Sequence, residues 1–174
     1  RCNEILKRLT LNPTHEDEFI DENFSIRDYL KEIILSFKET SNKNFILNFD
    51  QDTNSKKITK SIEIVYGLRN FIGNANKFSS QNIIITLKSD DKFTEVTIQD
   101  DGDGFPNTIL SKIGEPYLVS SNNIRKKNSG LGLGIFIGKN LLEKNFATIV
   151  CRNSKIKSGA EVIIKWKNED FNKI

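Results

Sequence analysis

The order of helical and strand patterns constrains the fold of this chain more than any other feature of its sequence. In chain order the predicted elements are a helix at 25–40, a strand at 44–50, a helix at 61–78, a hairpin of strands at 82–89 and 92–100, a helix at 130–145, and a second hairpin of strands at 147–154 and 160–166. A Rossmann fold requires strands that alternate with helices, which this order does not supply. The order instead predicts an α/β two-layer sandwich, with helices on one face of a mixed, largely antiparallel sheet.

The first predicted helix has both a start signal and an apolar face. Ser25, followed three residues later by Asp28, is typical of a capping box. The apolar face comprises Ile26, Tyr29, Leu30, Ile33, Ile34 and Phe37. The polar residues 51–60, which precede the second helix, are predicted to form a loop.

Composition excludes several classes of function. The 174 residues carry a formal net charge of only +3, so we expect no nucleic-acid partner. Cys2 and Cys151 lie far apart, which favours neither a disulfide framework nor a metal cluster and suits a reducing compartment. A single histidine, His15, excludes a multi-histidine metal site and disfavours a Ser–His or Cys–His catalytic pair.

The first 23 residues are expected to lie outside the main domain. Residues 1–11 place apolar side chains at helical spacing, but Pro13 disfavours helix at the residue before it, so the pattern predicts the tail of a helix that begins upstream. The acidic segment 14–22 is predicted to be a linker. Because the chain starts with Arg and contains no Met, we expect it to be part of a longer protein.

The second predicted helix presents two amides and an ammonium on one side. Asn70, Asn74 and Lys77 are spaced four and three residues apart, so they share one face. The apolar residues Leu68 and Ala75 lie roughly 140° away around the helix. The helix can therefore pack on the core and show polar groups to a cavity, although an ordinary solvated face is an equally open reading.

A cluster of acids and glycines follows the next hairpin, at Asp100-Asp101-Gly102-Asp103-Gly104. A calcium loop of the EF-hand type would need a carboxylate at its twelfth position, which is Lys112 when counted from Asp101. Two readings stay open. The segment is either a plain turn or a strand end that aims one carboxylate into a pocket, with glycines that let a planar ligand approach the backbone.

The third segment, the glycine-rich stretch 130–134 (GLGLG), opens the helix at 130–145. Glycines at a helix N-terminus expose unpaired N–H groups beside the positive end of the helix dipole, which favours phosphate binding. The Rossmann fingerprint is not met, since no strand immediately precedes the segment and residue 135 is Ile. A Walker A loop fails as well, because the spacing from Gly134 to Lys139 is one residue too short and Asn140 replaces Ser or Thr.

Together the three segments, in this order and spacing, are far more specific than any one of them. The chain resembles the ATP-binding catalytic domain of sensor histidine kinases, within the superfamily of gyrase, Hsp90, histidine kinases and MutL, over roughly residues 24–167. The resemblance implies a sandwich of the Bergerat type. The stretches RCNEIL, IGEPYLVSS, GLGLGIFIGKNLLE and GAEVIIKW are similar to the redox-responsive RegB/PrrB-type branch.

The resemblance also implies a role for each matching residue. Asn74 would be the Mg²⁺ ligand, Lys77 would contact phosphate oxygens, and Phe78 would pack near the ligand. Asp100 would accept the exocyclic amine of adenine. The glycines Gly102 and Gly104 would let the purine lie against the chain, and the phosphates would be received by Gly130, Leu131, Gly132 and Leu133. Segment 105–129 would be the ATP lid, with Arg125, Lys126 and Lys127 either on phosphate or simply solvated.

Asn70 distinguishes between reactions under this resemblance, because the ATPases of the superfamily carry a water-activating Glu at that position. An amide cannot act as a general base. The implied reaction is therefore ATP- and Mg²⁺-dependent transfer of a phosphoryl group to a histidine on a partner dimerisation domain, in which Asn70, Asn74 and Lys77 serve catalysis. A nucleotide-binding regulatory module without competent catalysis is the alternative, motivated by Asn128 and Gly73, which depart from the family pattern, as does Ala160.

The resemblance finally implies an organisation and a set of partners. Residues 1–12 would be the truncated end of a dimerisation and phosphoacceptor helix, 13–23 a linker, and 24–174 the catalytic ATP-binding domain. His15 is not expected to be the phosphoacceptor. The residues after it do not continue the sequence pattern of a phosphoacceptor box, and it follows the helix-ending Pro13. The expected partners are a response regulator and a second copy of the parent protein, which would act in the cytoplasm, with or without an inner-membrane anchor.

Overall fold

The central element of the fold is a five-stranded sheet with the strand order β2-β4-β5-β7-β6. The computed structural model describes residues 24–50, 57–58, 61–110, 112–113, 115, 133–154 and 158–174. The strands of this sheet are β2 (Asn44–Phe49), β4 (Asn82–Ser89), β5 (Phe93–Asp100), β6 (Thr148–Asn153) and β7 (Ala160–Lys167). Only the β2–β4 pair is parallel and the other three pairs are antiparallel, which confirms the predicted mixed, largely antiparallel sheet.

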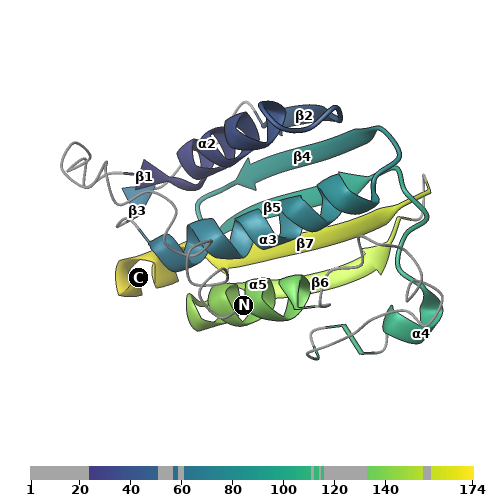
Figure 1. Ribbon diagram of the computed structural model, residues 1–174. Coiled ribbons are helices and arrows are strands. Elements are labelled where there is room, and N and C mark those ends of the chain that lie inside the picture. The colour runs from purple at the N-terminus through teal and green to yellow at the C-terminus, as the bar shows by residue number, and fades with distance from the viewer. Residues whose placement is uncertain are drawn as a thin grey trace, which may run out of the picture.

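Three helices cover one face of this sheet, as Figure 1 shows. They are α2 (Ile26–Lys38), α3 (Ile62–Phe78) and α5 (Gly134–Lys144), and α3 and α5 lie side by side along the sheet. The short helix α4 (Asn107–Leu110) follows β5, and a 3₁₀ helix (Asn168–Lys173) ends the chain. The predicted two-layer α/β sandwich is confirmed.

The predicted helix starts agree with the capping chemistry. The Ser25 hydroxyl accepts the backbone N–H of Asp28, and the Asp28 carboxylate accepts the backbone N–H of Ser25 at 3.1 Å, which completes the capping box. Ser61 caps α3 by accepting the backbone N–H of Ile64 at 3.3 Å. The prediction that 51–60 is entirely loop was wrong, because Lys57–Ile58 forms strand β3 and pairs with β1 (Phe24–Ser25).

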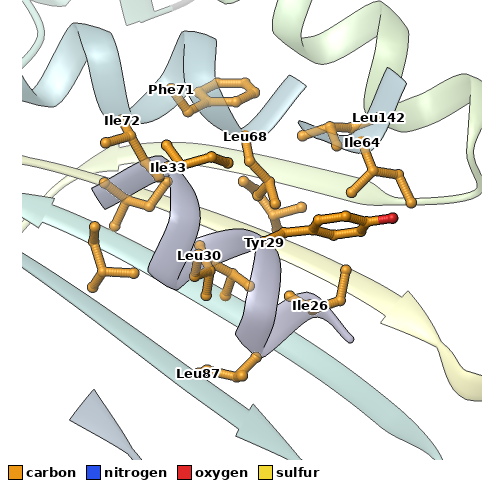
Figure 2. Close-up of a cluster of buried hydrophobic side chains, with 14 of the residues drawn as sticks. Ile26, Tyr29, Leu30, Ile33, Ile64, Leu68, Phe71, Ile72, Leu87 and Leu142 are labelled. Atoms are coloured by element: carbon orange, nitrogen blue, oxygen red, sulfur yellow. The ribbon is translucent and has the colours of Figure 1, made fainter. Parts of the chain in front are cut away.

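The core lies between the helical layer and the inner face of the sheet (Figure 2). The strands alternate buried and less buried residues, so Ile83, Ile85 and Leu87 of β4 all face the helices. The helices contribute the predicted apolar stripes, and the residues labelled in Figure 2 are Ile26, Tyr29, Leu30, Ile33, Ile64, Leu68, Phe71, Ile72, Leu87 and Leu142. This burial holds α3 in a fixed orientation, with its apolar side inward and its polar side away from the core.

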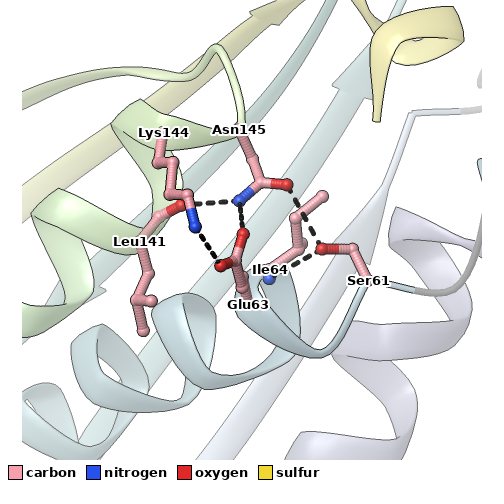
Figure 3. Close-up of polar contacts among 6 residues, drawn as sticks. All are labelled: Ser61, Glu63, Ile64, Leu141, Lys144 and Asn145. Atoms are coloured by element: carbon pink, nitrogen blue, oxygen red, sulfur yellow. Dashed lines mark hydrogen bonds and ion pairs between the residues drawn. The ribbon is translucent and has the colours of Figure 1, made fainter.

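A polar junction fastens the start of α3 to the end of α5 (Figure 3). Asn145 donates through Nδ2 to Glu63 Oε2 at 2.7 Å, and Lys144 Nζ binds Glu63 Oε1 at 2.7 Å. Ser61 Oγ donates to Asn145 Oδ1 at 3.3 Å, and Trp166 Nε1 donates to the backbone carbonyl of Asn145 at 3.1 Å. Because Asn145 is only 6% exposed, these bonds satisfy a buried amide and tie both helices to β7.

No helix within the described ranges has the length and the hydrophobicity needed to cross a bilayer. The predicted terminal helix at 1–12, the linker at 13–23 and His15 lie outside the described residues.

Candidate functional site

The polar side of α3 faces the first turns of α5. Asn70 and Asn74 are both partly buried there, whereas Lys77 is exposed near the C-terminal end of the helix. Asn70 donates through Nδ2 to the backbone carbonyl of Tyr66, one turn earlier, at 2.8 Å. The structure therefore brings the two asparagines together as the spacing predicted and sets the lysine at the solvent edge.

Close approach of α5 depends on its glycines. A Cβ on Gly138 would lie 3.1 Å from Asn70 Cβ and from the Phe71 ring, and a Cβ on Gly134 would lie 3.3 Å from Asn74 Nδ2. Larger residues would push the two helices apart. The glycines thus allow the backbone at the start of α5 to pack against the Asn74 side chain.

The side-chain amide of Asn74 has a buried N–H donor that no described residue accepts a hydrogen bond from. Its Nδ2 is buried and has no hydrogen-bond partner among the described residues. An unpaired buried amide costs free energy, and a ligand that accepts a hydrogen bond from Asn74 Nδ2 would remove that cost. The side-chain carbonyl oxygen of the same amide is a hard ligand of the kind that Mg²⁺ accepts.

The donor set around Asn74 limits what kind of metal site can form. No group of three or more His, Cys, Asp or Glu side chains suited to a metal ion occurs among the described residues. Mg²⁺ keeps several water ligands and often takes the rest from a phosphate-bearing substrate. The described residues around Asn74 therefore fit a Mg²⁺ ion that arrives with phosphates.

The first turn of α5 has backbone donors without a side-chain cap. Leu133 is the N-cap residue and makes no side-chain cap hydrogen bond. The free N–H groups of a helix N-terminus, together with its dipole, favour an anion at this point. Three predicted phosphate-binding residues, Gly130, Leu131 and Gly132, lie outside the described residues, as do Arg125, Lys126, Lys127 and Asn128 of the predicted lid.

Asp100, the last residue of β5, is held by backbone donors from two sides. Its Oδ1 accepts the N–H of Gly102 at 3.0 Å and the N–H of Ala160, at the start of β7, at 3.1 Å. Burial nevertheless raises the pKa of the Asp100 carboxyl above its usual value, because these bonds only partly offset the cost of removing the charge from water. Both hydrogen bonds from the described residues use Oδ1, which leaves Oδ2 as an acceptor for a ligand.

The neighbouring Asp101 is engaged differently. Its Oδ1 accepts the N–H of Gln81 at 2.9 Å, and its Oδ2 accepts both the N–H and the side-chain Nδ2 of Asn82 at 2.9 Å. Burial acts to raise the pKa of Asp101, but these bonds outweigh it and lower the pKa to about 2. With both oxygens bound to backbone at the start of β4, Asp101 is not arranged as a calcium ligand.

The glycines of this segment let other parts of the backbone approach. A Cβ on Gly102 would collide with the backbone carbonyl of Phe78, the last residue of α3. Gly104 has a φ of +77°, a conformation that favours glycine. Phe78 itself is 55% exposed, and Lys77 Nζ lies 5.2 Å from its ring centroid, so both side chains stand at the rim of the site.

Sequence reasoning did not predict the contacts of three residues that shape this end of the sheet. Gly159, with a φ of +117°, packs against the Asp100 backbone, where a Cβ would collide with the carbonyl oxygen. Ala160 donates to Asp100 as described above. Asn153 brackets Phe105 by accepting its N–H at 2.6 Å and donating to its carbonyl at 2.9 Å. The glycine just before the last strand pattern was the one signal in the sequence that pointed to such a close approach.

Gly73, where the family pattern favours an acid, lies on the side of α3 that faces α2. A Cβ there would lie 3.5 Å from the Phe37 ring, in ordinary contact. This departure therefore does not alter the face that carries Asn70 and Asn74.

Comparison with known proteins places these features in a family. Residues 59–170 match the family described as histidine kinase-, DNA gyrase B-, and HSP90-like ATPase. The chain is 33% identical over 108 residues to sensor histidine kinase RegB of Cereibacter sphaeroides, covering 59% of this chain and 23% of that protein. It is 24% identical over 155 residues to sporulation kinase A of Bacillus subtilis, covering 86% of this chain and 24% of that protein. The chain thus spans about a quarter of the length of these relatives.

Solved structures show the same fold. The mycobacterial sensor histidine kinase MprB matches with a TM-score of 0.68 at 18% identity, covering 84% of this chain and 96% of that one. The nucleotide-free catalytic domain of histidine kinase ThkA matches with a TM-score of 0.67 at 20% identity, covering 83% of this chain and 94% of that one. The sheet and its helical layer therefore have the same fold as these histidine kinase structures.

Proposed function

This chain belongs to the family of histidine kinase-, DNA gyrase B- and HSP90-like ATPases, and we propose that it is the ATP-binding kinase domain of a sensor histidine kinase. The observation that carries the proposal is that α3, which holds Asn74, ends against Gly102, two residues after Asp100. Asn74 offers a buried amide that lacks a partner among the described residues, and Asp100 offers a carboxylate fixed through one oxygen. The Nδ2 of Asn74 can donate a hydrogen bond to a phosphate oxygen and its Oδ1 can bind a phosphate-bound cation, whereas the Asp100 carboxylate suits the amine of adenine.

In this proposal Asp100 recognises adenine. Its Oδ2 would accept a hydrogen bond from the exocyclic amine of adenine, while Gly102 and Gly104 keep side chains out of the space beside it. Guanine carries an oxygen at the corresponding position, which would face the carboxylate without a hydrogen bond. The same geometry thus favours ATP over GTP.

The phosphates would lie between α3 and the start of α5. Lys77 would neutralise phosphate oxygens, and the uncapped first turn of α5, beginning at Leu133, would donate backbone N–H groups to them. Asn74 would hold Mg²⁺ through its side-chain oxygen. When bound, such an ion would offset the negative charge of the phosphates. We extend the phosphate-binding role to Gly130, Leu131 and Gly132.

Transfer to a protein side chain is favoured over hydrolysis because of Asn70. Its amide has no basic lone pair with which to take a proton from water, and its Nδ2 already donates to the Tyr66 carbonyl. Asn70 would instead keep the wall of the site polar without activating water. The chain's own contribution to catalysis is therefore to position the nucleotide and to balance its charge.

The nucleophile in this proposal is a histidine on a partner dimerisation domain. The named relatives are sensor and sporulation kinases several times longer than this chain, which leaves room for such a domain. We further propose that the parent protein is a homodimer. A response regulator would receive the phosphoryl group next. We place the domain in the cytoplasm, where ATP is available.

The proposal is tested by mixing this chain with a separately produced dimerisation domain, Mg²⁺ and γ-labelled ATP. We expect label on a histidine of the added domain and no steady release of phosphate by this chain alone. Asn74→Ala serves as the inactive control. Good ATP binding without any labelled histidine would favour the regulatory module instead, and sustained phosphate release would favour a hydrolytic ATPase.

A further inference from the structure

Two adjacent aspartates at the end of β5 hold different parts of the chain. Asp100 binds the backbone of Gly102 and Ala160, whereas Asp101 binds the backbone of Gln81 and Asn82. Two of these partners belong to the two strands that flank β5 in the sheet, because Asn82 begins β4 and Ala160 begins β7. Asp101 has no role in the adenine contact proposed above, yet both of its oxygens are fully engaged.

The backbone that Asp101 holds lies where the connection between α3 and β4, residues 79–81, enters the strand, at Gln81 and Asn82. Ser79 caps α3 by donating its N–H to the carbonyl of Ala75 at 2.8 Å. On the other side, Lys43 Nζ binds the carbonyls of Ser79 at 2.8 Å and Ser80 at 2.6 Å. The connection is therefore fastened from two directions immediately after the helix that carries Asn74 and Lys77.

The same strand end also packs on the last residue of α3. Gly102 lies against the Phe78 carbonyl so closely that no Cβ would fit between them. In the chain, Asp101 thus lies between Gly102, which contacts the end of α3, and Asp100, which is proposed to contact adenine. Any shift of Asp101 would change the distance between the end of α3 and Asp100.

We propose that Asp101 is a positioning residue for nucleotide binding, which fixes the phosphate-side groups of α3 relative to the adenine acceptor Asp100. It does so through its three hydrogen bonds to Gln81 and Asn82 and does not touch the nucleotide. The inference rests on the proposed function, because it concerns the alignment of that same site.

Alignment matters because ATP engages both ends of the site at once. Lys77 and Asp100 contribute fully to one bound ATP only when their separation matches that of the phosphates and the base. If the connection at 79–81 shifts, Lys77 can still contact phosphate and Asp100 can still contact adenine, but one bound ATP cannot make both contacts at once. The free energy that Lys77 contributes to ATP binding should then depend on Asp101, although these two side chains lie on different elements.

The test is a double-mutant cycle measured by calorimetric titration with ATP and Mg²⁺. Asp101→Asn keeps the shape of the side chain but places an NH₂ group against a backbone donor, so it breaks at least one of the bonds. We expect Asp101→Asn to weaken ATP binding about tenfold, and we expect Lys77→Ala to weaken it much less in that background than in the parent. Non-additivity of this kind reports coupling between the two residues.

Asp103→Asn is the matched control, because Asp103 is exposed and the change removes the same charge from the same segment. It should leave ATP binding and the Lys77 effect unchanged. If Asp101→Asn binds ATP as tightly as the parent, or if Lys77→Ala costs the same factor in both backgrounds, the inference is wrong. Failure of the parent chain itself to bind ATP would instead overturn the proposed function and the inference with it.

Asn82→Ala provides a second route should Asp101→Asn not fold. It removes the Nδ2 bond to Asp101, and a bond from Asn44 to the same side chain, while both backbone bonds to Asp101 stay. We expect a loss of two- to threefold in ATP affinity and a reduced effect of Lys77→Ala. An effect of Lys77→Ala equal to that in the parent overturns the inference here as well.

Discussion

The backbone carbonyl of Phe78 packs directly against the α-carbon of Gly102, with no room for a Cβ between them. This contact joins the end of α3, which carries Asn74 and Lys77, to the segment that carries Asp100. The two halves of the candidate site are therefore held together by backbone, and the glycine is required by space.

The first prediction concerns that contact. Gly102→Ala should weaken ATP binding at least tenfold and lower the free energy of unfolding by about 1–3 kcal/mol, because the backbone must shift to admit the methyl group. Gly73→Ala is the control, since a Cβ at this helical position meets only the Phe37 ring at 3.5 Å. That change should raise the free energy of unfolding by about 0.5–1 kcal/mol and leave ATP binding intact. Equal ATP affinity in Gly102→Ala and the parent would contradict the account.

The second prediction separates binding from stability on α3. Asn74→Ala should abolish Mg²⁺-dependent ATP binding yet leave the free energy of unfolding unchanged or higher, because Asn74 Nδ2 has no partner to lose among the described residues. Asn76→Ala should instead affect stability and not ATP binding, since Asn76 Oδ1 accepts a hydrogen bond from Ser41 at 2.6 Å. Its loss should lower the free energy of unfolding by about 1 kcal/mol without changing ATP affinity. Calorimetry and urea unfolding of both variants check this, and a large loss of stability in Asn74→Ala would refute it.

A third prediction follows from the different environments of the two adjacent aspartates. At pH 7, Asp100→Asn should not reduce the free energy of unfolding, because burial disfavours the Asp100 charge and the amide oxygen can keep both backbone bonds. Asp101→Asn should reduce it by about 1–2 kcal/mol, since its charged oxygens accept three hydrogen bonds. Urea unfolding of the two variants measures the difference, and a loss of stability in Asp100→Asn that equals the loss in Asp101→Asn would count against it.

The fourth prediction gives the pH dependence of the Asp101 contribution. The pKa of Asp101 is lowered from 3.8 to about 2 in the folded protein, so the unfolded chain binds the proton more readily. The stability that Asp101 contributes is therefore complete above about pH 5 and is lost as the pH falls through 2. The difference in unfolding free energy between the parent and Asp101→Asn should stay constant from pH 7 to 5 and shrink below pH 4. A difference that grows on acidification would have the wrong sign.

Much of the fold could be predicted because its elements carry local signals. The helix starts at Ser25 and Ser61 depend on nearby residues, and the strands of the main sheet show alternating burial. The pairing of Phe24–Ser25 with Lys57–Ile58 could not be predicted, because a two-residue strand has no periodicity to detect.

The site was predictable where its residues share one element and not where they meet across the chain. Asn70 and Asn74 could be grouped because helical spacing alone puts them on one face. Ala160 reaches Asp100 across 60 residues, and Asn153 reaches Phe105 across 48, so both contacts depend on the register of strands that local patterns leave open. The different tasks of Asp100 and Asp101 likewise emerge only from their partners in space.

The central claim is that this chain recognises ATP through Asp100, and calorimetric titration with ATP and GTP in the presence of Mg²⁺ tests it most directly. We predict one ATP site per chain, GTP binding at least tenfold weaker, and loss of most ATP affinity together with most of this preference in Asp100→Asn. An Asp100→Asn variant that remains folded and binds ATP as tightly as the parent, or a parent chain that binds neither nucleotide, would contradict the claim.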